Sequence, residues 1–321
     1  MKSVLVTGSD GFVGRRLCPA MAGRGYCVTA AVRKQPVHAI HGATKVAPVG
    51  DIALDVDWMP VLRGIEVVVH LAGRAHVASE ASGVSFQEFR RVNVEGSRRL
   101  AEASLRAGVE RFVYVSSIKV NGECTGARPF REEDAPDPHG PYAVSKWEAE
   151  GVLRELSARS GMSVVIVRPP LVYGPGVKGN LLRLMKQIDM GAPLPLAGIA
   201  NRRSMIGLDN LVDALVLVST AAAAAGQTFL VSDDEAVSTT ELGCCIARAL
   251  GKTARFFTLP RSLIPLLAAH SPSLGAVLQR LTASLIVDSS KIRNVLHWVP
   301  RQSFTDGIDS MARAYRNAKR A

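Results

Sequence analysis

The sequence has few aromatic residues, since Phe, Trp and Tyr together make up 5% of its 321 positions. Lys and Arg exceed Asp and Glu by 39 − 28 = 11, and they are dispersed in ones and twos rather than set among aromatic side chains. This charge suits nucleic acid, anionic lipid or a nucleotide diphosphate equally. Without an aromatic platform for stacked bases, we expect no nucleic-acid partner.

Long hydrophobic runs are also missing. The longest apolar stretch, residues 256–269, is interrupted by Pro260 and Pro265 and is shorter than the ~18 residues that span a bilayer. The N-terminus shows no export signal, and the five cysteines include no CxxC pair. We therefore expect a cytoplasmic protein with no transmembrane segment and, because no His/Cys/Asp spacing resembles a ligand set, no metal.

Short β-branched runs alternate with helical stretches along the first two thirds of the chain. This alternation predicts an α/β fold with a parallel sheet covered by helices. From about Pro169 the pattern changes to segments punctuated by Pro and Gly, which indicates a smaller second lobe over the end of the sheet. The predicted strands are 3–7, 27–32, 66–70, 111–116, 163–167 and 228–231, and the clearest helices are 86–107, 141–160 and 208–225.

A Gly-rich turn follows the first predicted strand directly and opens a helix. It contains Gly8, Gly11, Phe12, Val13 and Gly14. Glycines let the backbone approach a pyrophosphate closely, and the helix N-terminus supplies free N–H donors. Because this glycine-rich segment lies between a strand and a helix, it predicts a dinucleotide-binding site. The alternative is an ordinary turn with no ligand.

The second predicted strand lacks the acidic residue that usually binds the adenosine ribose. It ends Ala30-Ala31-Val32-Arg33-Lys34. A guanidinium at Arg33 can pair with a 2′-phosphate, which favours NADP(H). A solvated basic loop beside an NAD(H) site remains the alternative.

Tyr142 and Lys146 are four residues apart and share one face of a predicted helix. A nearby ammonium favours the phenolate of a tyrosine, which makes it useful in proton transfer near neutral pH. Ser117 lies just after a predicted strand, at the edge of the sheet where ligands bind. The three residues are candidate catalytic groups.

Together these motifs resemble the extended short-chain dehydrogenase/reductase family over essentially the whole chain, in the branch of UDP-glucose 4-epimerase. Bacterial nucleotide-sugar 4-ketoreductases and epimerases of surface-polysaccharide (O-antigen) synthesis are similar. The resemblance implies a Rossmann-type doubly wound sheet in residues 1–170, with 204–233 returning to it, and a substrate-binding lobe in 171–203 and 234–321. The supporting matches are 50–52, 70–73, 92–96, 168–176, 203–213 and 288–291.

The same resemblance implies roles for particular residues. Ser117 and Tyr142 would bind the C4 oxygen of a UDP-linked sugar, and Lys146 would also hold the nicotinamide ribose. A homodimer through a four-helix interface is also implied. The remaining residues implied are Asp51, Ile52, Leu71 and Ala72 for the cofactor, and Asn180, Arg203 and Arg280 for the substrate.

Three departures from the family pattern narrow the reaction. Ile118 and Lys119 stand where nucleotide-sugar dehydratases carry acids, so dehydration is not expected; Leu171 stands where epimerases often have Asn. We therefore expect reduction of a UDP-4-keto-6-deoxy-hexosamine, with UDP-sugar 4-epimerisation on retained NAD as the alternative. An NADPH-dependent reductase for a non-sugar ketone and a non-catalytic dinucleotide-sensing protein remain open.

Overall fold

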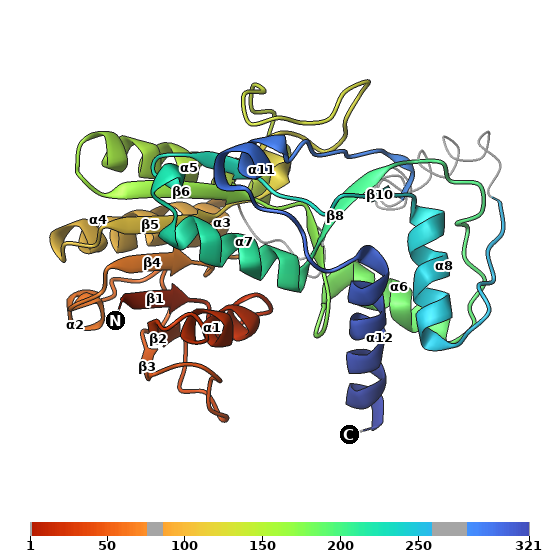
Figure 1. Cartoon of the computed structure of the whole chain (residues 1–321), viewed down its shortest axis with the longest axis horizontal. Helices are drawn as coiled ribbons and strands as arrows, with labels where there is room; N and C mark the ends of the chain where they lie inside the picture. The colour runs from red at the N-terminus through yellow and green to blue at the C-terminus, as the bar shows by residue number, and fades with distance from the viewer. Residues whose placement is uncertain (1, 76–85, 259–280, 321) are drawn as a thin grey trace.

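The computed structural model describes residues 2–75, 86–258 and 281–320. In these ranges, seven parallel strands form the main sheet in the order β3-β2-β1-β4-β5-β6-β9 (Figure 1). Strand order reverses between β1 and β4, the place where open α/β sheets bind ligands beyond their carboxyl ends. The strands are β1 (Ser3–Thr7), β2 (Cys27–Val32), β3 (Lys45–Pro48), β4 (Val67–His70), β5 (Arg111–Val115), β6 (Ser163–Arg168) and β9 (Thr228–Leu230).

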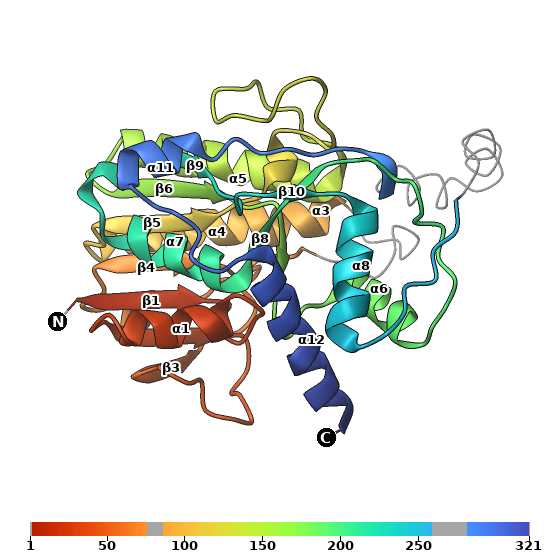
Figure 2. The same cartoon turned by 45° about the vertical axis from the view of Figure 1, so that its right-hand side comes forward.

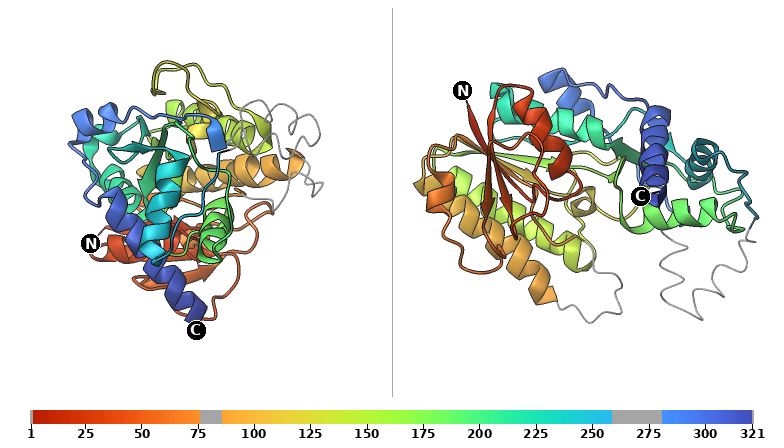
Figure 3. Two further views of the ribbon diagram at one scale, coloured as in Figure 1. Left: turned by 90° about the vertical axis from the view of Figure 1, so that its right-hand side faces the viewer. Right: turned by 90° about the horizontal axis from the view of Figure 1, so that it is seen from below.

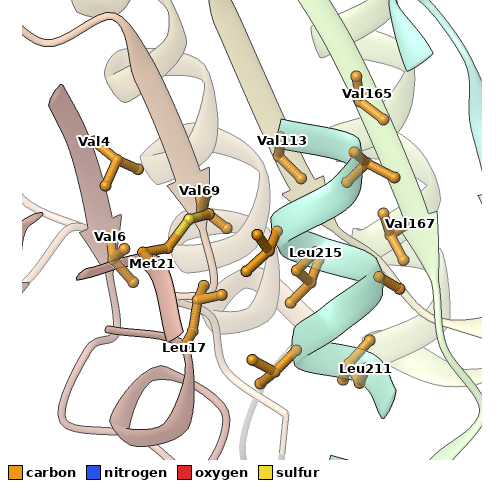
Figure 4. Packing of buried hydrophobic residues seen from close by; sticks show 14 of the residues in the cluster. Val4, Val6, Leu17, Met21, Val69, Val113, Val165, Val167, Leu211 and Leu215 are labelled. Carbon is orange, nitrogen blue, oxygen red and sulfur yellow. The ribbon is translucent and has the colours of Figure 1, made fainter. Parts of the chain in front are cut away.

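The central strands are apolar on both faces because each face is covered by helices. Val4 and Val6 of β1 belong to one hydrophobic cluster, and Leu5 between them belongs to another. On the first face, Leu17 and Met21 of one helix and Leu211 and Leu215 of another pack against the strands (Figure 4). The helices of this face are α1 (Gly14–Ala22), α7 (Leu208–Thr220) and α11 (Ser290–Leu296).

The opposite face of the main sheet carries a second helical layer, which the view from below separates from the first (Figure 3). Leu62, Leu100, Ala101, Ala149 and Leu153 bury its apolar side. Its helices that contribute to this cluster are α2 (Met59–Leu62), α4 (Ser97–Arg106) and α5 (Gly140–Ala158). The predicted Rossmann-type fold is thus confirmed.

A second, three-stranded sheet lies beyond the main one, in the order β10-β8-β7 within the described ranges. This sheet and three helices share a hydrophobic core, which includes Tyr173, Met185, Ile246 and Ile308. The three helices stand beside the main sheet in Figure 2. Its strands are β7 (Leu171–Tyr173), β8 (Arg203–Gly207) and β10 (Ala236–Val237), and its helices are α6 (Gly179–Asp189), α8 (Thr239–Leu250) and α12 (Phe304–Arg320).

Two predicted helices are wrong in detail. The stretch 86–107 is not one α-helix but α3 (Phe86–Phe89), the π-helix η2 (Arg90–Gly96) and α4. The stretch 208–225 ends as an α-helix at Thr220 and continues as the 3₁₀ turn η4 (Ala222–Ala224). A seven-residue π segment widens the turn without changing composition, so 3.6-residue periodicity does not reveal it.

Candidate active site

The Gly-rich turn folds tightly between the ends of β1 and β4. Gly8 has φ = +66°, and the N–H of Gly11 donates to its carbonyl oxygen at 2.9 Å. A Cβ on Gly14 would overlap the Gly8 carbonyl, and one on Gly8 would stand 3.0 Å from the backbone nitrogen of Ala72. The residues therefore form a backbone-lined cradle at the N-terminus of α1, which fits a pyrophosphate.

Contacts with β2 and with the hydrophobic core hold the Gly-rich turn in place. The buried Ser9 hydroxyl donates to the Ala31 carbonyl at 2.8 Å, which joins the turn to β2. The partly buried side chains of Phe12 and Val13 pack against the hydrophobic core. The turn is thus held by the core on which it sits.

The other residues expected to bind the cofactor lie at the carboxyl ends of adjacent strands. Arg33 is exposed directly after β2, and Leu71 and Ala72 are partly buried directly after β4. Beyond β3, Ile52 is buried and the Asp51 carboxylate accepts a hydrogen bond from the Ala53 N–H at 3.0 Å. Because β3, β2, β1 and β4 are parallel neighbours, these loops share one edge of the sheet.

Ser117 and Tyr142 meet at the same edge. Ser117 follows β5 and caps the 3₁₀ turn η3 (Ile118–Val120), accepting a hydrogen bond from the Lys119 N–H at 3.3 Å. Tyr142 lies in the first turn of α5, directly after Pro141, a residue that is favoured at the start of helices. Burial raises the pKa of Tyr142, and a hydrogen bond with Ser117 partly opposes that rise.

Lys146 is buried one turn further along α5, with its side chain directed to the strand ends. Its Nζ donates to the Val115 carbonyl at 2.8 Å and lies 4.5 Å from the centre of the Tyr114 ring. Burial lowers the pKa of Lys146 to about 8, against the opposing effect of Glu150. An ammonium of this kind can stabilise a neighbouring phenolate and still titrate in a useful range.

Asn93 also belongs to this region, although sequence reasoning did not place it among the site residues. Its Nδ2 donates to Ser145 Oγ at 2.9 Å and to the Arg74 carbonyl, and its Oδ1 accepts from the Arg74 N–H. A Cβ on Gly73 would lie 3.1 Å from Asn93 Oδ1 and 3.5 Å from Lys146 Nζ. A buried Asn within an amphipathic helix is the signal that could have found it.

Two of the three other residues expected to bind substrate lie in the described part of the chain. Arg203 is half buried at the start of β8 and donates a hydrogen bond to the Ala283 carbonyl at 3.1 Å. Burial lowers the pKa of Arg203, and the negative charge of Glu123 opposes this shift. Glu123 also pairs with Lys119 at 2.8 Å, which connects Arg203 electrostatically to the Ser117 turn. Asn180 is exposed in the first turn of α6, and Arg280 lies outside the described residues.

Over residues 2–75, 86–258 and 281–320, no three His, Cys, Asp or Glu side chains gather as a metal site would need. The same ranges contain no helix that is both long and apolar enough to cross a membrane.

A Rossmann-type sheet with a Gly-rich turn, and a Ser/Tyr/Lys group at the same edge, is the arrangement of a nicotinamide-dependent oxidoreductase. Residues 4–232 match the NAD dependent epimerase/dehydratase family. The chain belongs to this family and is an NAD(P)-dependent enzyme of the extended short-chain dehydrogenase/reductase type.

Individual relatives agree with this assignment. The chain is 40% identical to a UDP-glucose 4-epimerase of Vibrio cholerae over 99% of this chain and 96% of that protein. It is 29% identical to the N-acetyl-alpha-D-glucosaminyl-diphospho-ditrans,octacis-undecaprenol 4-epimerase of Escherichia coli O157:H7, over 81% and 76%. The structure of MoeE5 in complex with UDP-glucuronic acid and NAD is similar with a TM-score of 0.81, 26% identity, and 98% and 99% coverage.

Proposed function

We propose that this enzyme transfers a hydride at C4 of a UDP-linked sugar, with Ser117, Tyr142 and Lys146 as its catalytic residues. The observation that carries the proposal is the hydrogen-bonded Ser117 and Tyr142 beside the buried Lys146 ammonium, at the edge that carries the Gly-rich turn. Bound nicotinamide would supply or accept the hydride at this edge. The known binding of UDP-sugars by MoeE5 supports a nucleotide-sugar substrate.

Each catalytic residue has a distinct task in this proposal. Tyr142 moves the proton of the C4 oxygen, and Ser117 donates a hydrogen bond to that same oxygen. Lys146 favours the phenolate form of Tyr142 by its charge and also binds the nicotinamide ribose. Tyr142 and Lys146 lie on one face of α5, so a single helix sets the spacing between them.

The proposed cofactor-binding residues would contact different parts of the dinucleotide. Gly8, Gly11 and Gly14, with Phe12 and Val13, would surround the pyrophosphate. The groups assigned to the adenosine and nicotinamide portions are Arg33, Asp51, Ile52, Leu71, Ala72, Tyr142 and Lys146. In this division, residues 1–170 and 204–233 carry the dinucleotide, and residues 171–203 and 234–321 bind the sugar nucleotide through Asn180, Arg203 and Arg280.

For the direction of the reaction, we propose net reduction of a UDP-4-keto-6-deoxy-hexosamine for surface-polysaccharide synthesis. Ile118 and Lys119 carry no carboxylate, so the two acids that dehydratases have at these positions are absent here. Lys119 pairs instead with Glu123. Leu171, where epimerases often have Asn, is 47% exposed at the start of β7. The exposed Arg33 suits a reducing cofactor that is exchanged at each turnover.

A second candidate is UDP-sugar 4-epimerisation with retained cofactor. The 40% identity to the Vibrio cholerae UDP-glucose 4-epimerase over almost the whole chain favours it. The two reactions use the same three residues and differ in whether the cofactor returns to its starting oxidation state before product leaves.

The stoichiometry of the cofactor separates these reactions. The purified enzyme is incubated with UDP-4-keto-6-deoxy-hexosamine, UDP-glucose and UDP-galactose, with and without NADH or NADPH, and products are identified by mass spectrometry and chromatography. One NAD(P)H consumed for each keto-sugar reduced supports the reductase. Interconversion of UDP-glucose and UDP-galactose without net consumption supports the epimerase, and no turnover with any of them contradicts the proposed function.

We further propose a homodimer formed by α5 and the α3–η2–α4 segment of two copies, located in the cytoplasm. These two elements pack side by side on one face of the main sheet. Sedimentation velocity at several concentrations would test the dimer.

A further inference from the structure

A buried guanidinium joins two separate elements beneath the candidate catalytic residues. Arg168, at the end of β6, is 2% exposed, and its Nε and Nη2 donate to the two carboxylate oxygens of Glu150 at 2.9 and 2.6 Å. Its Nη1 donates to Asn121 Oδ1 at 2.9 Å. One planar side chain therefore fixes the positions of two others.

The two acceptors belong to the two elements that carry the catalytic groups. Glu150 lies on α5 one turn beyond Lys146 and two turns beyond Tyr142, which places all three on one helix face. Asn121 ends the 3₁₀ turn that Ser117 begins. Arg168 thus links the serine turn to the tyrosine–lysine helix through side-chain hydrogen bonds, in addition to the hydrogen bond between Ser117 and Tyr142.

The backbone around Arg168 strengthens this connection. The Ser116 N–H donates to the Val167 carbonyl at 2.8 Å, and the Ile118 N–H donates to the Pro169 carbonyl at 3.0 Å. Ser117 is therefore held on both sides by the residues that flank Arg168. Movement of this strand end would move Ser117 with it.

A buried ion pair such as that between Arg168 and Glu150 adds little to the free energy of unfolding by itself. Removing charges from water costs about as much as their attraction returns, so such pairs often add nothing over apolar side chains. The guanidinium instead offers a fixed fork that a lysine cannot reproduce. Its geometry, rather than its charge, distinguishes this position.

We propose that Arg168 is a positioning residue that sets the spacing between Ser117 and Tyr142 by holding Asn121 and Glu150 at once. This inference rests on the proposed function, in which those two hydroxyls grip one substrate oxygen. A displacement of about 1 Å in such an arrangement can cost ~10²-fold in rate.

The first test replaces the fork and keeps the charge. Arg168→Lys should lower kcat about 10- to 100-fold while leaving the dissociation constant of NAD(P)H within about threefold, because the Gly-rich turn is untouched. Arg154→Lys is the matched control: Arg154 donates to the same Glu150 oxygen at 2.8 Å but is 40% exposed, and its replacement should leave kcat unchanged. Equal kcat for Arg168→Lys and wild type would overturn the inference.

A double-mutant cycle separates positioning from a general loss of structure. In a Ser117→Ala background there is no serine to place, so Arg168→Lys should cost much less than it does in the wild type. Undiminished, additive losses would overturn the inference. Thermal unfolding of each variant is measured alongside.

Asn121→Ala tests the other end of the connection and leaves the Arg168–Glu150 pair in place, so it decides the matter if Arg168→Lys does not fold. It should lower kcat by a similar factor, and wild-type kcat would contradict the inference. If Ser117→Ala and Tyr142→Phe themselves keep full turnover, the proposed function fails. If they lose turnover while Arg168→Lys and Asn121→Ala do not, only this inference fails.

Discussion

Thr7 and His70 end two neighbouring strands and meet side chain to side chain, with 2.6 Å between Thr7 Oγ1 and His70 Nδ1. His70 Nε2 lies 3.0 Å from Ser97 Oγ on α4, and the Ala72 N–H donates to Thr7 Oγ1. Both ring nitrogens are thus engaged, as expected of a core histidine rather than a catalyst. The imidazole joins β1, β4 and α4 directly beneath the Gly-rich turn.

Because of His70, we expect the folded protein to lose stability in mild acid. Burial, and then the nearby Lys146 charge, lower the pKa of His70 to about 3. Because the unfolded chain binds this proton near pH 6.5 and the folded protein does not, stability falls as pH decreases from there. The group should account for about 2 kcal/mol of unfolding free energy lost between pH 7 and 5.

Urea unfolding of the wild type and His70→Gln at pH 7, 6 and 5 tests this contribution. The variant should be less stable at pH 7 but lose less between pH 7 and 5. The exposed His139→Gln, as a control, should keep the wild-type pH dependence. An unchanged dependence in His70→Gln would contradict the assignment.

Tyr142→Phe should keep the fold and the dinucleotide but lose most turnover. It removes one hydroxyl whose proton transfer is worth typically 10²–10⁴ in rate. Steady-state kinetics, with fluorescence titration of NAD(P)H, gives both quantities. Tyr315→Phe, which alters a phenol bonded to Asp189 at 3.1 Å on α6, is the control and should keep wild-type rates. Near-normal turnover in Tyr142→Phe would remove Tyr142 from the mechanism.

Lys146→Ala should reduce both the rate and the affinity for the cofactor, since in the proposed function one ammonium serves Tyr142 and the ribose. Because the pKa of Lys146 is about 8 in the free protein, cofactor affinity in the wild type should weaken as pH rises through this value. Titration of NAD(P)H from pH 7 to 9 tests it, with the exposed Lys186→Ala as control. A kinetic defect with unchanged cofactor affinity would contradict the ribose contact.

Arg33 should set a preference for NADP(H) over NAD(H), because its guanidinium can pair with the 2′-phosphate and no acid follows β2. Arg33→Ala should then weaken NADPH binding much more than NADH binding, whereas Lys34→Ala, the neighbouring exposed control, should affect the two less unequally. Isothermal titration with both cofactors measures the ratio. Equal losses, or a wild type that prefers NADH, would reject the role of Arg33.

Much of the main sheet could be predicted because its strands are buried and flanked by turn residues. The bounds of β1 and β2 agree with prediction, and those of β4, β5, β6 and β9 differ by a residue at one end. β3 was missed because Lys45-Val46-Ala47-Pro48 is short, ends in proline and lies at the sheet edge.

The candidate site residues could be named from sequence where a local pattern or a place just after a predicted strand marks them, as for Ser117. Tyr142 and Lys146 share a helix face, and the Gly-rich turn is continuous. The contacts of Asn93 with Ser145 and of Arg168 with Glu150 and Asn121 join segments 18 to 52 residues apart. No local pattern encodes them, so they required the folded chain.

The Gly-rich turn and the loop after β2 offer very different freedom to change. Any side chain at Gly14 would collide with the turn itself, and one at Gly8 would press on the exit of β4, so selection can alter little there. Arg33 is exposed to solvent and follows β2, which β1 and β4 separate from the strand that precedes Ser117, so it can vary without disturbing the core. With the role proposed for Arg33, substitutions in this loop would exchange one nicotinamide cofactor for another, over evolutionary time or in a directed-evolution experiment, while the proposed catalytic residues stay where they are.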